Sequence, residues 1–545
     1  MFPSTPTIES YLRHGGMTSA DETADAMVSR VVTALGAVER HVTGNNPQES
    51  ADFERRLGQE LDAGRIVLSP TIMANAGRGP PRPLATCAAP PVNLRSELRT
   101  IQAVVDRYHQ AGMGTGFNLD GLEDPLAMLQ YLNYVAAVGP GLGGGRGTTV
   151  TGRAAAPTPN AATLPAGSAD PLVGNIALLS LSHPRAEEFV ASKVAADTEG
   201  EVWRFNIALR VSDAEMKAAL RRDDRERALL LAAAGSAHDC AEPALVFTDR
   251  MEETNPTPLL GPYTSTGPST EIGLLTGETC VFGQVNLGRL HRPLTTEPGG
   301  WRGCGPGAFR AAAGGSSVPV DFDGLAEAVY TLARALDDAV EIGLSLHPTV
   351  LSSELTRANR KVGVGVCGLA DLLDAAGVAY DSLQAQVIAQ ETLAYMHYVA
   401  KLASVELAVQ RGPCPAIARG RSRYADPEYL RRFTSVDVRS VTTGDWAALA
   451  DRVAEVHLLR NTTSTAIGPT PHTGPLVGAS PGIDPAGGTN PTAQLTMAAA
   501  AQSCLDEAVA TTIHLPAGTS AEDVYDTYVA AWELRCKSVA VAVDD

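Results

Sequence analysis

The spacing of apolar residues alternates between helix-like and strand-like along the 545-residue chain. Residues 20–65 carry apolar side chains at the period of an amphipathic helix. These helix-spaced positions include Met27, Val31, Val32 and Leu35. Helical and short apolar segments then alternate to the end, which is typical of an α/β fold. We predict a helical N-terminal region over residues 1–65 and an α/β domain over residues 66–545.

Two stretches interrupt this alternation. Residues 139–173 and 291–319 are rich in Gly and Ala, with Pro throughout the first stretch and a Gly-Gly pair at 299–300 and at 314–315 in the second. Such composition is typical of loops rather than of regular elements. Both stretches are therefore predicted to be insertions into the α/β domain.

Charge and cysteine usage narrow the classes of partner. The net charge of −18 argues against a polymeric nucleic acid or an acidic membrane surface, which both need a basic footprint. No signal peptide and no apolar run of about 20 residues is present, so we predict a cytoplasmic protein without a membrane partner. The eight cysteines are scattered without a CxxC pair, which favours a reducing compartment over a disulfide framework. No spacing of metal ligands is found, and no metal site is predicted.

A series of motifs runs along most of residues 20–541. In order they are SPTIMANAG (69–77), LATCAAPPV (84–92), GMGTGFNLDGL (112–122), LSLSHPRAEEFVASK (179–193), FNIALRVSDAEM (205–216), VFTDRMEETNPTP (246–258), STGPSTEIGLLTGETCVFGQVNLGRL (265–290), KVGVGVCGLADLL (361–373), LLRNTTSTAIGPTPHTGPLVGASPGIDP (458–485) and TTIHLPAGTSAEDVYDTYVAAWELRCKSVAV (511–541). Each motif alone is a weak signal, whereas their order and spacing are specific.

In that order the motifs resemble the ribonucleotide reductase large (catalytic) subunit family, and the closing segment is most similar to its adenosylcobalamin-dependent class II. The resemblance implies a ten-stranded α/β barrel built from two five-stranded parallel halves. It also implies a finger loop that threads the barrel and carries the radical residue at its tip. The cofactor of such an enzyme supplies the first radical, and the protein positions and shields it.

The finger loop departs from the family. Relatives read approximately Asn-Pro-Cys-Gly-Glu, whereas this chain reads GPSTE at residues 267–271. Ser269 therefore stands where the resemblance places the radical cysteine. A serine O–H bond is much stronger than a thiol S–H or a ribose C–H bond, so Ser269 is not expected to abstract hydrogen. Gly267 and Thr270 differ as well, which indicates that the tip changed as a unit.

Three further residues are implied to be catalytic by the resemblance. Glu271 matches the glutamate that accepts the proton of the ribose 3′ hydroxyl, a role suited to a carboxylate held close to a hydroxyl. The alternative is a glutamate kept for a local hydrogen bond. Cys87 and Cys280 match the pair that reduces the sugar, and the alternative is two singly buried cysteines acting as small apolar residues. Turnover of the pair would need an external thiol.

The candidate substrate-binding residues come from four segments. In PTPHTG (469–474) hydroxyls and N–H groups at a helix start could hold phosphate, although two prolines remove donors and a plain loop is the alternative. Ser69 and Thr71 belong to the matching substrate-side segment, while Thr86 and Gly267 adjoin the catalytic residues. The full set is Ser69, Thr71, Thr86, Gly267, Thr470, His472, Thr473 and Gly474.

The resemblance also carries expectations about regulation and partners. Residues 139–173 replace the region of the substrate-specificity loops, so an altered or absent effector response is expected. The residues identify no cofactor, and the resemblance makes adenosylcobalamin the one to test. A nucleotide or nucleoside is the implied small-molecule partner. A homodimer through helices near residues 95–135 is the expected assembly.

Three functions stay open from the sequence. The first is a ribonucleotide reductase-like enzyme that acts on a nucleotide or nucleoside by non-standard chemistry. The second is a catalytically inactive nucleotide-binding homologue or partner subunit. The third is a true ribonucleotide reductase with its radical on another cysteine, for example Cys367. Activity, rather than fold, separates the three.

Overall fold

The computed structural model describes residues 6–19, 21–42, 47–138, 174–199, 203–221, 224–293, 301–302, 310–311, 318–435, 438–456, 459–485 and 490–544. The insertion predicted at residues 139–173 lies outside the described residues. Part of the second predicted insertion is described, and it includes the short antiparallel pair β10 (Trp301–Arg302) and β11 (Arg310–Ala311).

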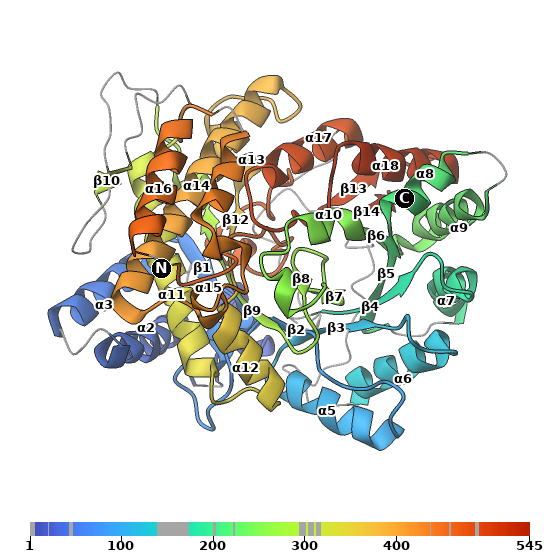
Figure 1. Ribbon diagram of the computed structural model, residues 1–545, viewed down its shortest axis with the longest axis horizontal. Coiled ribbons are helices and arrows are strands. Elements are labelled where there is room, and N and C mark those ends of the chain that lie inside the picture. Colours follow the sequence, from blue (N-terminus) through green and yellow to red (C-terminus); the bar gives the residue numbers. More distant parts are fainter. Residues whose placement is uncertain are drawn as a thin grey trace.

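Three helices form the N-terminal region: α1 (Pro6–His14), α2 (Ala24–Val42) and α3 (Pro47–Asp62). The predicted apolar positions Met27, Val31 and Leu35 are buried, and Val32 is half-buried. The second and third helices pack against the long helix α11 (Phe322–Gly343), as Figure 1 shows at lower left. The predicted helical N-terminal region is confirmed.

The first half of the barrel is a set of parallel strands. In spatial order they are β2 (Cys87–Ala88), β3 (Gly114–Asn118), β4 (Asn175–Ser180), β5 (Phe205–Val211) and β6 (Ala244–Phe247). Their crossover helices are α5 (Leu98–Gln110), α6 (Pro125–Val138), α7 (Ala186–Glu199), α8 (Asp213–Ala219) and α9 (Arg225–Cys240). Parallel neighbours need such crossovers, which is why helices cover the outer face of this half (Figure 1).

The second half also runs parallel within itself. It contains β9 (Thr279–Asn286), β12 (Val362–Cys367), β13 (Thr512–Leu515) and β14 (Ser538–Val543). Parallel bridges from Val364 to Thr465 and from Ile467 to Val509 connect β12 to the segment that continues into β13. The covering helices include α12 (Val350–Asn359), α13 (Leu369–Ala375), α14 (Leu383–Arg411), α17 (Pro491–Gln502) and α18 (Ala521–Glu533).

The two halves meet antiparallel at both seams. β9 pairs antiparallel with β2 and with β1 (Ile66–Leu68), and β14 pairs antiparallel with β6. The strands form one ten-stranded sheet, and the two bridges close it into a ring. The predicted ten-stranded α/β barrel is confirmed.

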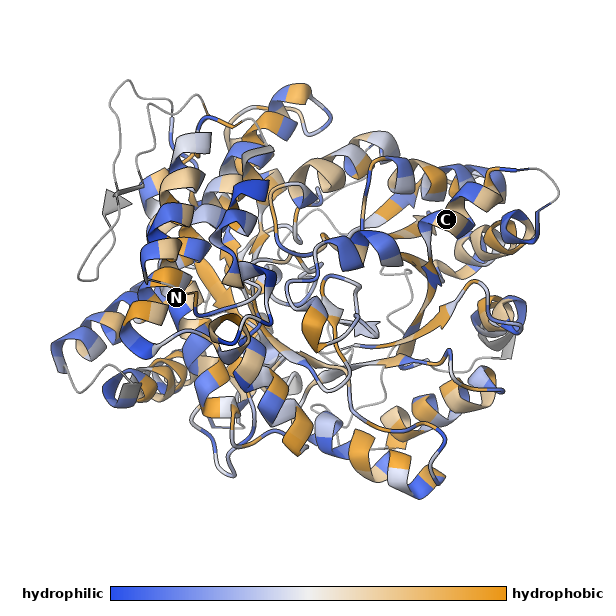
Figure 2. Ribbon diagram, in the orientation of Figure 1, coloured by the Kyte–Doolittle hydropathy of each residue, from blue (hydrophilic) through white to orange (hydrophobic). Residues whose placement is uncertain are grey.

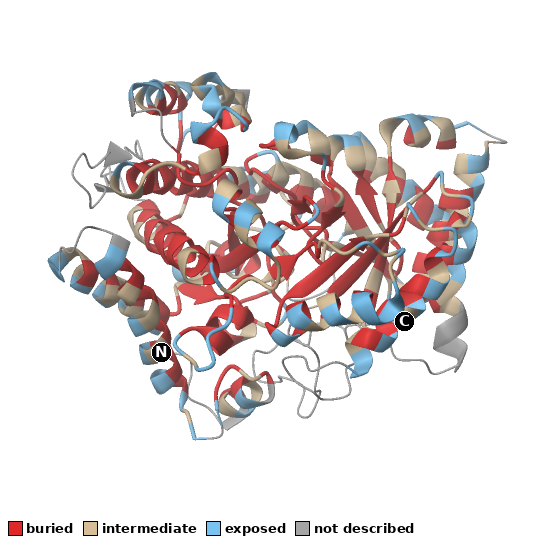
Figure 3. Ribbon diagram, turned by 60° about the horizontal axis from the view of Figure 1, so that its bottom comes forward, coloured by how far each residue is buried: buried red, intermediate tan, exposed pale blue. Residues whose placement is uncertain are grey.

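Burial follows this architecture. β9 and β12 are buried at every position, because helices cover the outside and other chain segments fill the inside. Figure 3 shows the buried strands between partly exposed helices, and Figure 2 shows that the outer helices carry polar residues on one side. Among the described residues no helix has both the length and the apolar character needed to cross a membrane.

A short hairpin lies in the middle of the ring (Figure 1). Its strands are β7 (Ser265–Thr266) and β8 (Gly273–Leu274), which pair antiparallel. The remaining helical elements are α4 (Pro70–Asn75), α10 (Thr248–Glu253), α15 (Pro415–Ala418), α16 (Thr443–Val456), and the 3₁₀ turns η1 (Pro258–Leu260), η2 (Leu287–Arg289), η3 (Arg423–Ala425), η4 (Pro427–Ser435) and η5 (Pro475–Val477).

Candidate active site in the barrel

The hairpin passes close to β3, and a glycine makes that approach possible. A Cβ at Gly116 would lie 2.3 Å from both the Ser265 hydroxyl oxygen and the Thr266 carbonyl oxygen. Any larger residue at 116 would therefore push the hairpin away. This contact packs the hairpin directly against β3 of the first half of the barrel.

The tip of the hairpin is fixed from both halves. The Asn206 side-chain amide on β5 donates to the Pro268 carbonyl at 3.0 Å. From the second half, the Ala508 N–H donates to the Glu271 carbonyl at 3.1 Å. Within the tip, Thr270 adopts a φ of 65° and its N–H donates to the Gly267 carbonyl at 2.9 Å. The tip is thus a tight turn held at a defined place in the barrel.

The base of the hairpin is held by a buried cluster of charges. The Lys361 ammonium donates to the Gly273 carbonyl at 2.8 Å and lies 3.1 Å from the Glu278 carboxylate. The Tyr263 hydroxyl donates to the Glu507 carboxylate at 2.8 Å. Burial and then the Glu507 charge raise the pKa of Tyr263, which keeps it a phenol that donates. We name Tyr263, Lys361, Glu278 and Glu507 the base cluster.

The carboxyl group of Glu271 lies at the centre of the tip. One of its oxygens accepts the Ser269 N–H at 3.0 Å, and the other lies 3.7 Å from the Cys87 sulfur, within reach of the thiol proton. Glu271 is buried, and burial raises the pKa of its carboxyl group above the usual range. A carboxyl group with a raised pKa can exchange a proton with a nearby hydroxyl near neutral pH.

Gly267 makes room for this carboxylate. A Cβ at residue 267 would lie 2.2 Å from a Glu271 carboxylate oxygen, which is far inside any allowed contact. The absence of a side chain at residue 267 therefore goes together with a glutamate folded back over its own loop. The two positions are structurally coupled.

The structure brings the two predicted cysteines together. Cys87 and Cys280 are direct partners in the antiparallel pairing of β2 with β9, where Cα atoms lie about 4.5–5.5 Å apart. That separation is within the range a disulfide spans. Both thiols are free and buried, and the Cys280 thiol together with burial raises the pKa of Cys87. The raised pKa favours the protonated thiol at Cys87, which is a poor nucleophile.

Ser269 completes a continuous group of contacts. It is half-buried, its N–H binds Glu271, and its carbonyl accepts the Thr270 hydroxyl at 2.6 Å. The predicted catalytic residues Ser269, Glu271, Cys87 and Cys280 thus lie together, although they come from three separate segments. Their chemical roles stay predictions.

The predicted phosphate loop has a different construction from the expected helix start. Residues 470–474 form a turn in which the Gly474 N–H donates to the Thr470 carbonyl at 3.0 Å. The Thr470 hydroxyl accepts the Gly482 N–H at 2.8 Å, and Thr473 is buried. The turn leads only into the three-residue 3₁₀ helix η5, whose dipole is small.

The loop still approaches the hairpin, but His472 does not. A Cβ at Gly468 would lie 3.9 Å from the Glu271 side chain, so the loop begins beside the tip. The His472 ring instead stacks on Tyr11 of α1, and its Nδ1 lies 2.7 Å from the Tyr11 hydroxyl. Thr470, Thr473 and Gly474 therefore remain candidates for substrate contact, whereas His472 binds the N-terminal helix.

Of the other predicted substrate residues, Ser69 keeps a buried hydroxyl without a hydrogen-bond partner among the described residues. The Thr71 hydroxyl donates to the Gly112 carbonyl at 3.1 Å. The Thr86 hydroxyl accepts the Phe282 N–H at 3.3 Å. Of these three hydroxyls, that of Ser69 has both its donor and its acceptor capacity left for a ligand.

Comparison with known proteins supplies the family. The family model described as "Ribonucleotide reductase, barrel domain" matches residues 225–489. A vitamin B12-dependent ribonucleoside-diphosphate reductase of Mycobacterium tuberculosis is 27% identical over 98% of this chain and 78% of its own length. One from Thermoplasma acidophilum is 30% identical over 44% of this chain and 30% of its own length.

The chain belongs to the ribonucleotide reductase large-subunit family.

The B12-dependent relatives confirm the predicted likeness to class II of the ribonucleotide reductases. In structure, the alpha subunit of a class Id ribonucleotide reductase from Actinobacillus ureae superposes with a TM-score of 0.71 and 15% identity, over 99% of this chain and 97% of that chain. At that identity the likeness establishes the fold alone. The reductase fold is therefore shared well beyond class II.

Cys367, the alternative radical site, lies at the end of β12 and is fully buried. It packs in the large apolar cluster with Val364 and Leu369, whereas Cys87 and Cys280 belong to a separate cluster beside the hairpin. Burial raises the pKa of the Cys367 thiol far above its usual range. These contacts are those of a core residue of the reductase barrel.

Several residues that position the reductase site were not selected from the sequence. They are Asn206, Tyr263, Lys361 and Glu507. Asn206 lies inside the motif FNIALRVSDAEM, and Lys361 opens KVGVGVCGLADLL, so motif membership was the available signal. Within the described residues no group of three or more His, Cys, Asp or Glu side chains could hold a metal ion.

Proposed function

We propose that this chain is a nucleotide- or nucleoside-binding enzyme that keeps the reductase barrel and its acid–base carboxyl group but not the thiyl-radical step. The observation that carries the proposal is the Glu271 carboxyl group, buried and in contact with both the Ser269 N–H and the Cys87 thiol. A proton-transfer group of this kind is useful only if a substrate hydroxyl reaches it. Because the chain's relatives include ribonucleoside-diphosphate reductases, a nucleoside hydroxyl is the fitting partner.

Ser269 argues against the standard reaction. The hairpin tip presents a hydroxyl where a thiol would receive and pass on the radical. A serine O–H bond is much stronger than a thiol S–H bond. A cofactor radical that can take hydrogen from a thiol is therefore not expected to take it from Ser269. The chemistry that remains at the tip is proton transfer by Glu271.

The two cysteines could add a two-electron step. If the Cys87 and Cys280 thiols transfer two electrons and two protons to a bound substrate, they become a disulfide joined across β2 and β9. Their register allows that bond without strand movement. An external thiol would then have to reduce the disulfide before the next turnover.

Adenosylcobalamin does not fit the tip of this hairpin. When bound, such a cofactor supplies an organic radical that a nearby thiol accepts. The residue at the accepting place is Ser269. The neighbouring Cys87 thiol contacts the Glu271 carboxylate, and the Cys280 thiol lies 4.0 Å from the Cys87 carbonyl. We therefore propose an activity that is independent of adenosylcobalamin.

A nucleotide-binding homologue without turnover is the second candidate. The raised pKa of Cys87 favours it, because a cysteine held as a neutral thiol is slow in thiol exchange. In either case the expected location is cytoplasmic. A homodimer through α5 and α6 also remains part of the proposal, supported by the exposed apolar side chains Leu98, Tyr134 and Val138 on those helices.

The test combines binding with product analysis. The protein is incubated with each common ribonucleoside, its 5′-mono-, di- and triphosphates and a dithiol, and products are identified by mass spectrometry. Glu271→Gln should lower any turnover by about 10²–10⁴-fold while binding persists. Ser269→Ala is the matched control, since it keeps the N–H that Glu271 uses, and it should retain activity.

Three outcomes are distinguished. Turnover lost in Glu271→Gln and kept in Ser269→Ala supports the enzyme. Saturable nucleotide binding without any product supports the second candidate. A chain that neither binds nor converts any of these nucleosides or nucleotides contradicts both.

A further inference from the structure

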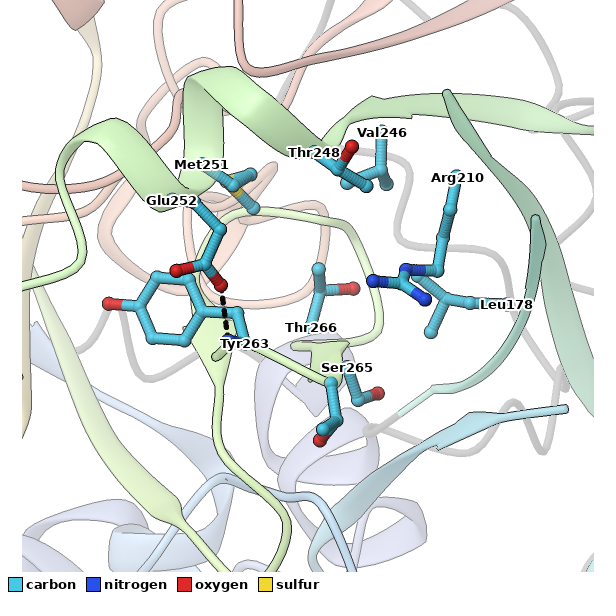
Figure 4. Close-up of a pocket in the computed structure, with 10 residues that line it drawn as sticks. Leu178, Arg210, Val246, Thr248, Met251, Glu252, Tyr263, Ser265 and Thr266 are labelled. Atoms are coloured by element: carbon cyan, nitrogen blue, oxygen red, sulfur yellow. Dashed lines mark hydrogen bonds between the residues drawn. The ribbon is translucent and has the colours of Figure 1, made fainter. Parts of the chain in front are cut away.

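A small pocket opens on the other side of the hairpin, between β7 and the ends of three barrel strands. Its lining comes from β4, β5, β6, α10 and the hairpin, and it includes Leu178, Arg210, Val246, Glu252, Ser265 and Thr266. None of the predicted catalytic or substrate-binding residues lines it. In Figure 4 the Arg210 guanidinium and the Thr266 hydroxyl point toward each other from opposite sides of the pocket.

The carboxylates around the pocket are already engaged. The Glu252 carboxylate accepts the Tyr263 N–H and, at 3.0 Å, the Asn255 side-chain amide. On the opposite side, Arg210 uses one terminal nitrogen to bind Asp120. The Asp120 carboxylate also accepts both the Ser180 N–H and the Ser180 hydroxyl. The acceptors near this pocket therefore have partners.

The pocket side chains Arg210, Ser265 and Thr266 can all donate hydrogen bonds. Ser265 and Thr266 are 4% and 3% exposed, and their hydroxyls have no hydrogen-bond partner among the described residues. Arg210 directs the rest of its planar fork of N–H groups into the pocket. Buried polar groups without a partner are costly, and a ligand that accepts from them would remove that cost.

The geometry points to a binding site for an oxyanion group of a small molecule, held by the Arg210 guanidinium and the Ser265 and Thr266 hydroxyls. The nearby charges favour a carboxylate over a phosphate. Asp120 already neutralises Arg210 and Glu252 lies on the facing wall, so a dianion would be repelled more strongly than a monoanion. Because this site shares no residue with the Glu271 site, it takes a second molecule or a distal carboxylate of the substrate.

Acetate and inorganic phosphate serve as probes on the full chain. Acetate binding is followed by ligand-observed saturation-transfer NMR, and phosphate is then added as a competitor. Saturable acetate binding is expected, with weaker displacement by phosphate. Thr266→Val should weaken acetate binding about tenfold, the usual loss for one hydrogen bond to a charged group. Arg210→Lys should weaken it at least as much, since it keeps the charge and removes the fork.

Matched variants separate binding from folding. Thr331→Val removes a buried, unpartnered hydroxyl on α11, away from the pocket, and should leave acetate binding unchanged. Thr266→Val should keep the melting temperature, because no described protein group depends on that hydroxyl. Phosphate that outcompetes acetate at this site would reverse the predicted preference and identify a phosphate ligand instead.

Two results would overturn the proposal: no saturable binding of either probe, or binding that Thr266→Val and Arg210→Lys leave intact. Loss of binding in Thr473→Val alone would assign the anion to residues 470–474 instead. Glu271→Gln should not affect acetate binding. Failure of this proposal is therefore distinguishable from failure of the proposed nucleotide chemistry.

Discussion

The two ends of the central hairpin are built on different principles. At its base, Lys361, Glu278, Glu507 and Tyr263 are all buried, and they bind one another and the hairpin backbone. At its tip, Ser269 is half-buried, and Glu271 contacts one backbone N–H and one thiol. Ion pairs thus hold the base, whereas the tip is held by hydrogen bonds, both within it and from Asn206 and the Ala508 N–H.

We expect this difference to let the barrel keep its fold when residues at the hairpin tip are substituted. The path of the hairpin is set by the base cluster and by Gly116 on β3, and none of these residues belongs to the tip. We therefore expect substitutions at residues 267, 269 and 270 to alter the chemistry presented to the barrel interior without moving the hairpin. The following predictions test whether base and tip are separable in this way, in order of expected effect.

Removing the Lys361 charge from the base cluster should have the largest effect on stability. Lys361→Met leaves the buried carboxylates of Glu278 and Glu507 without their cation, and breaking a buried pair in this way typically costs about 3–5 kcal/mol. The free energy of unfolding, measured by urea denaturation, should fall by that amount. Arg99→Ala breaks an ion pair with Glu97 that is exposed to water and should give no measurable change. A Lys361→Met variant as stable as the original would show that the base cluster does not hold the fold.

The second-largest effect is expected from the titration of Lys537, which should make the free energy of unfolding depend on pH. Burial lowers the pKa of Lys537 from an ordinary 10.5 to about 8. Between those two pH values the unfolded chain holds a proton that the folded chain has released, so the contribution to stability rises with pH by about 3 kcal/mol. Below pH 8 the contribution is flat, because both states are protonated.

Lys537→Met isolates this titration, since tyrosines and cysteines titrate in both proteins. The difference in free energy of unfolding between the two proteins should change by about 3 kcal/mol from pH 7.5 to 10.5, in favour of the original chain at high pH. A difference that stays constant over this range would mean that Lys537 has an ordinary pKa in the folded protein.

The buried lysines show which contacts of the hairpin could be predicted from the sequence and which could not. Only five lysines occur, and Lys193, Lys361, Lys401 and Lys537 are buried. The motif order predicted the barrel, its hairpin and the meeting of Cys87 with Cys280, because motifs fix register. It could not predict that Lys361 pairs with Glu278, since motif order does not show how two side chains are oriented. It could not predict that His472 binds Tyr11, because Tyr11 precedes the first motif.

The phosphate loop and the tip show the same limit in more detail. The sequence predicts a helix start in PTPHTG (469–474). In the structure the Gly474 N–H instead donates to the Thr470 carbonyl, and only a three-residue 3₁₀ helix follows. From the resemblance, Gly267 is expected to differ from the residue that relatives carry in the finger loop. The physical meaning of that difference, space for the Glu271 carboxylate, required the three-dimensional position of residue 271.

Adding a methyl group at residue 267 should displace the Glu271 carboxylate within the tip. Gly267→Ala places a Cβ 2.2 Å from the Glu271 carboxylate in its present position, so the carboxylate must leave the Ser269 N–H. We expect a loss of about 1–3 kcal/mol in stability from overpacking, and a loss of any Glu271-dependent turnover. Urea denaturation and product assays measure the two effects.

Gly235→Ala is the matched control for that substitution. Gly235 lies within α9, and an added Cβ meets no atom within 4 Å. Alanine there should stabilise the chain by about 0.5–1 kcal/mol, since it lowers the entropy of the unfolded state and favours the helix. Equal behaviour of the two variants would contradict the coupling of residue 267 to Glu271.

The smallest expected effect comes from restoring the family's thiol at the tip. Ser269→Cys keeps the N–H that binds Glu271 and exchanges one half-buried oxygen for sulfur, so stability should change by less than about 0.5 kcal/mol. We expect no deoxynucleotide on incubation with ribonucleotides, adenosylcobalamin and a dithiol, because Gly267 offers no side chain to the substrate and Thr270 holds a left-handed φ of 65°. Ser269→Ala sets the background of the same assay. Deoxynucleotide from Ser269→Cys above that background would show that the serine alone blocks the radical step, and that the tip is otherwise still a reductase tip.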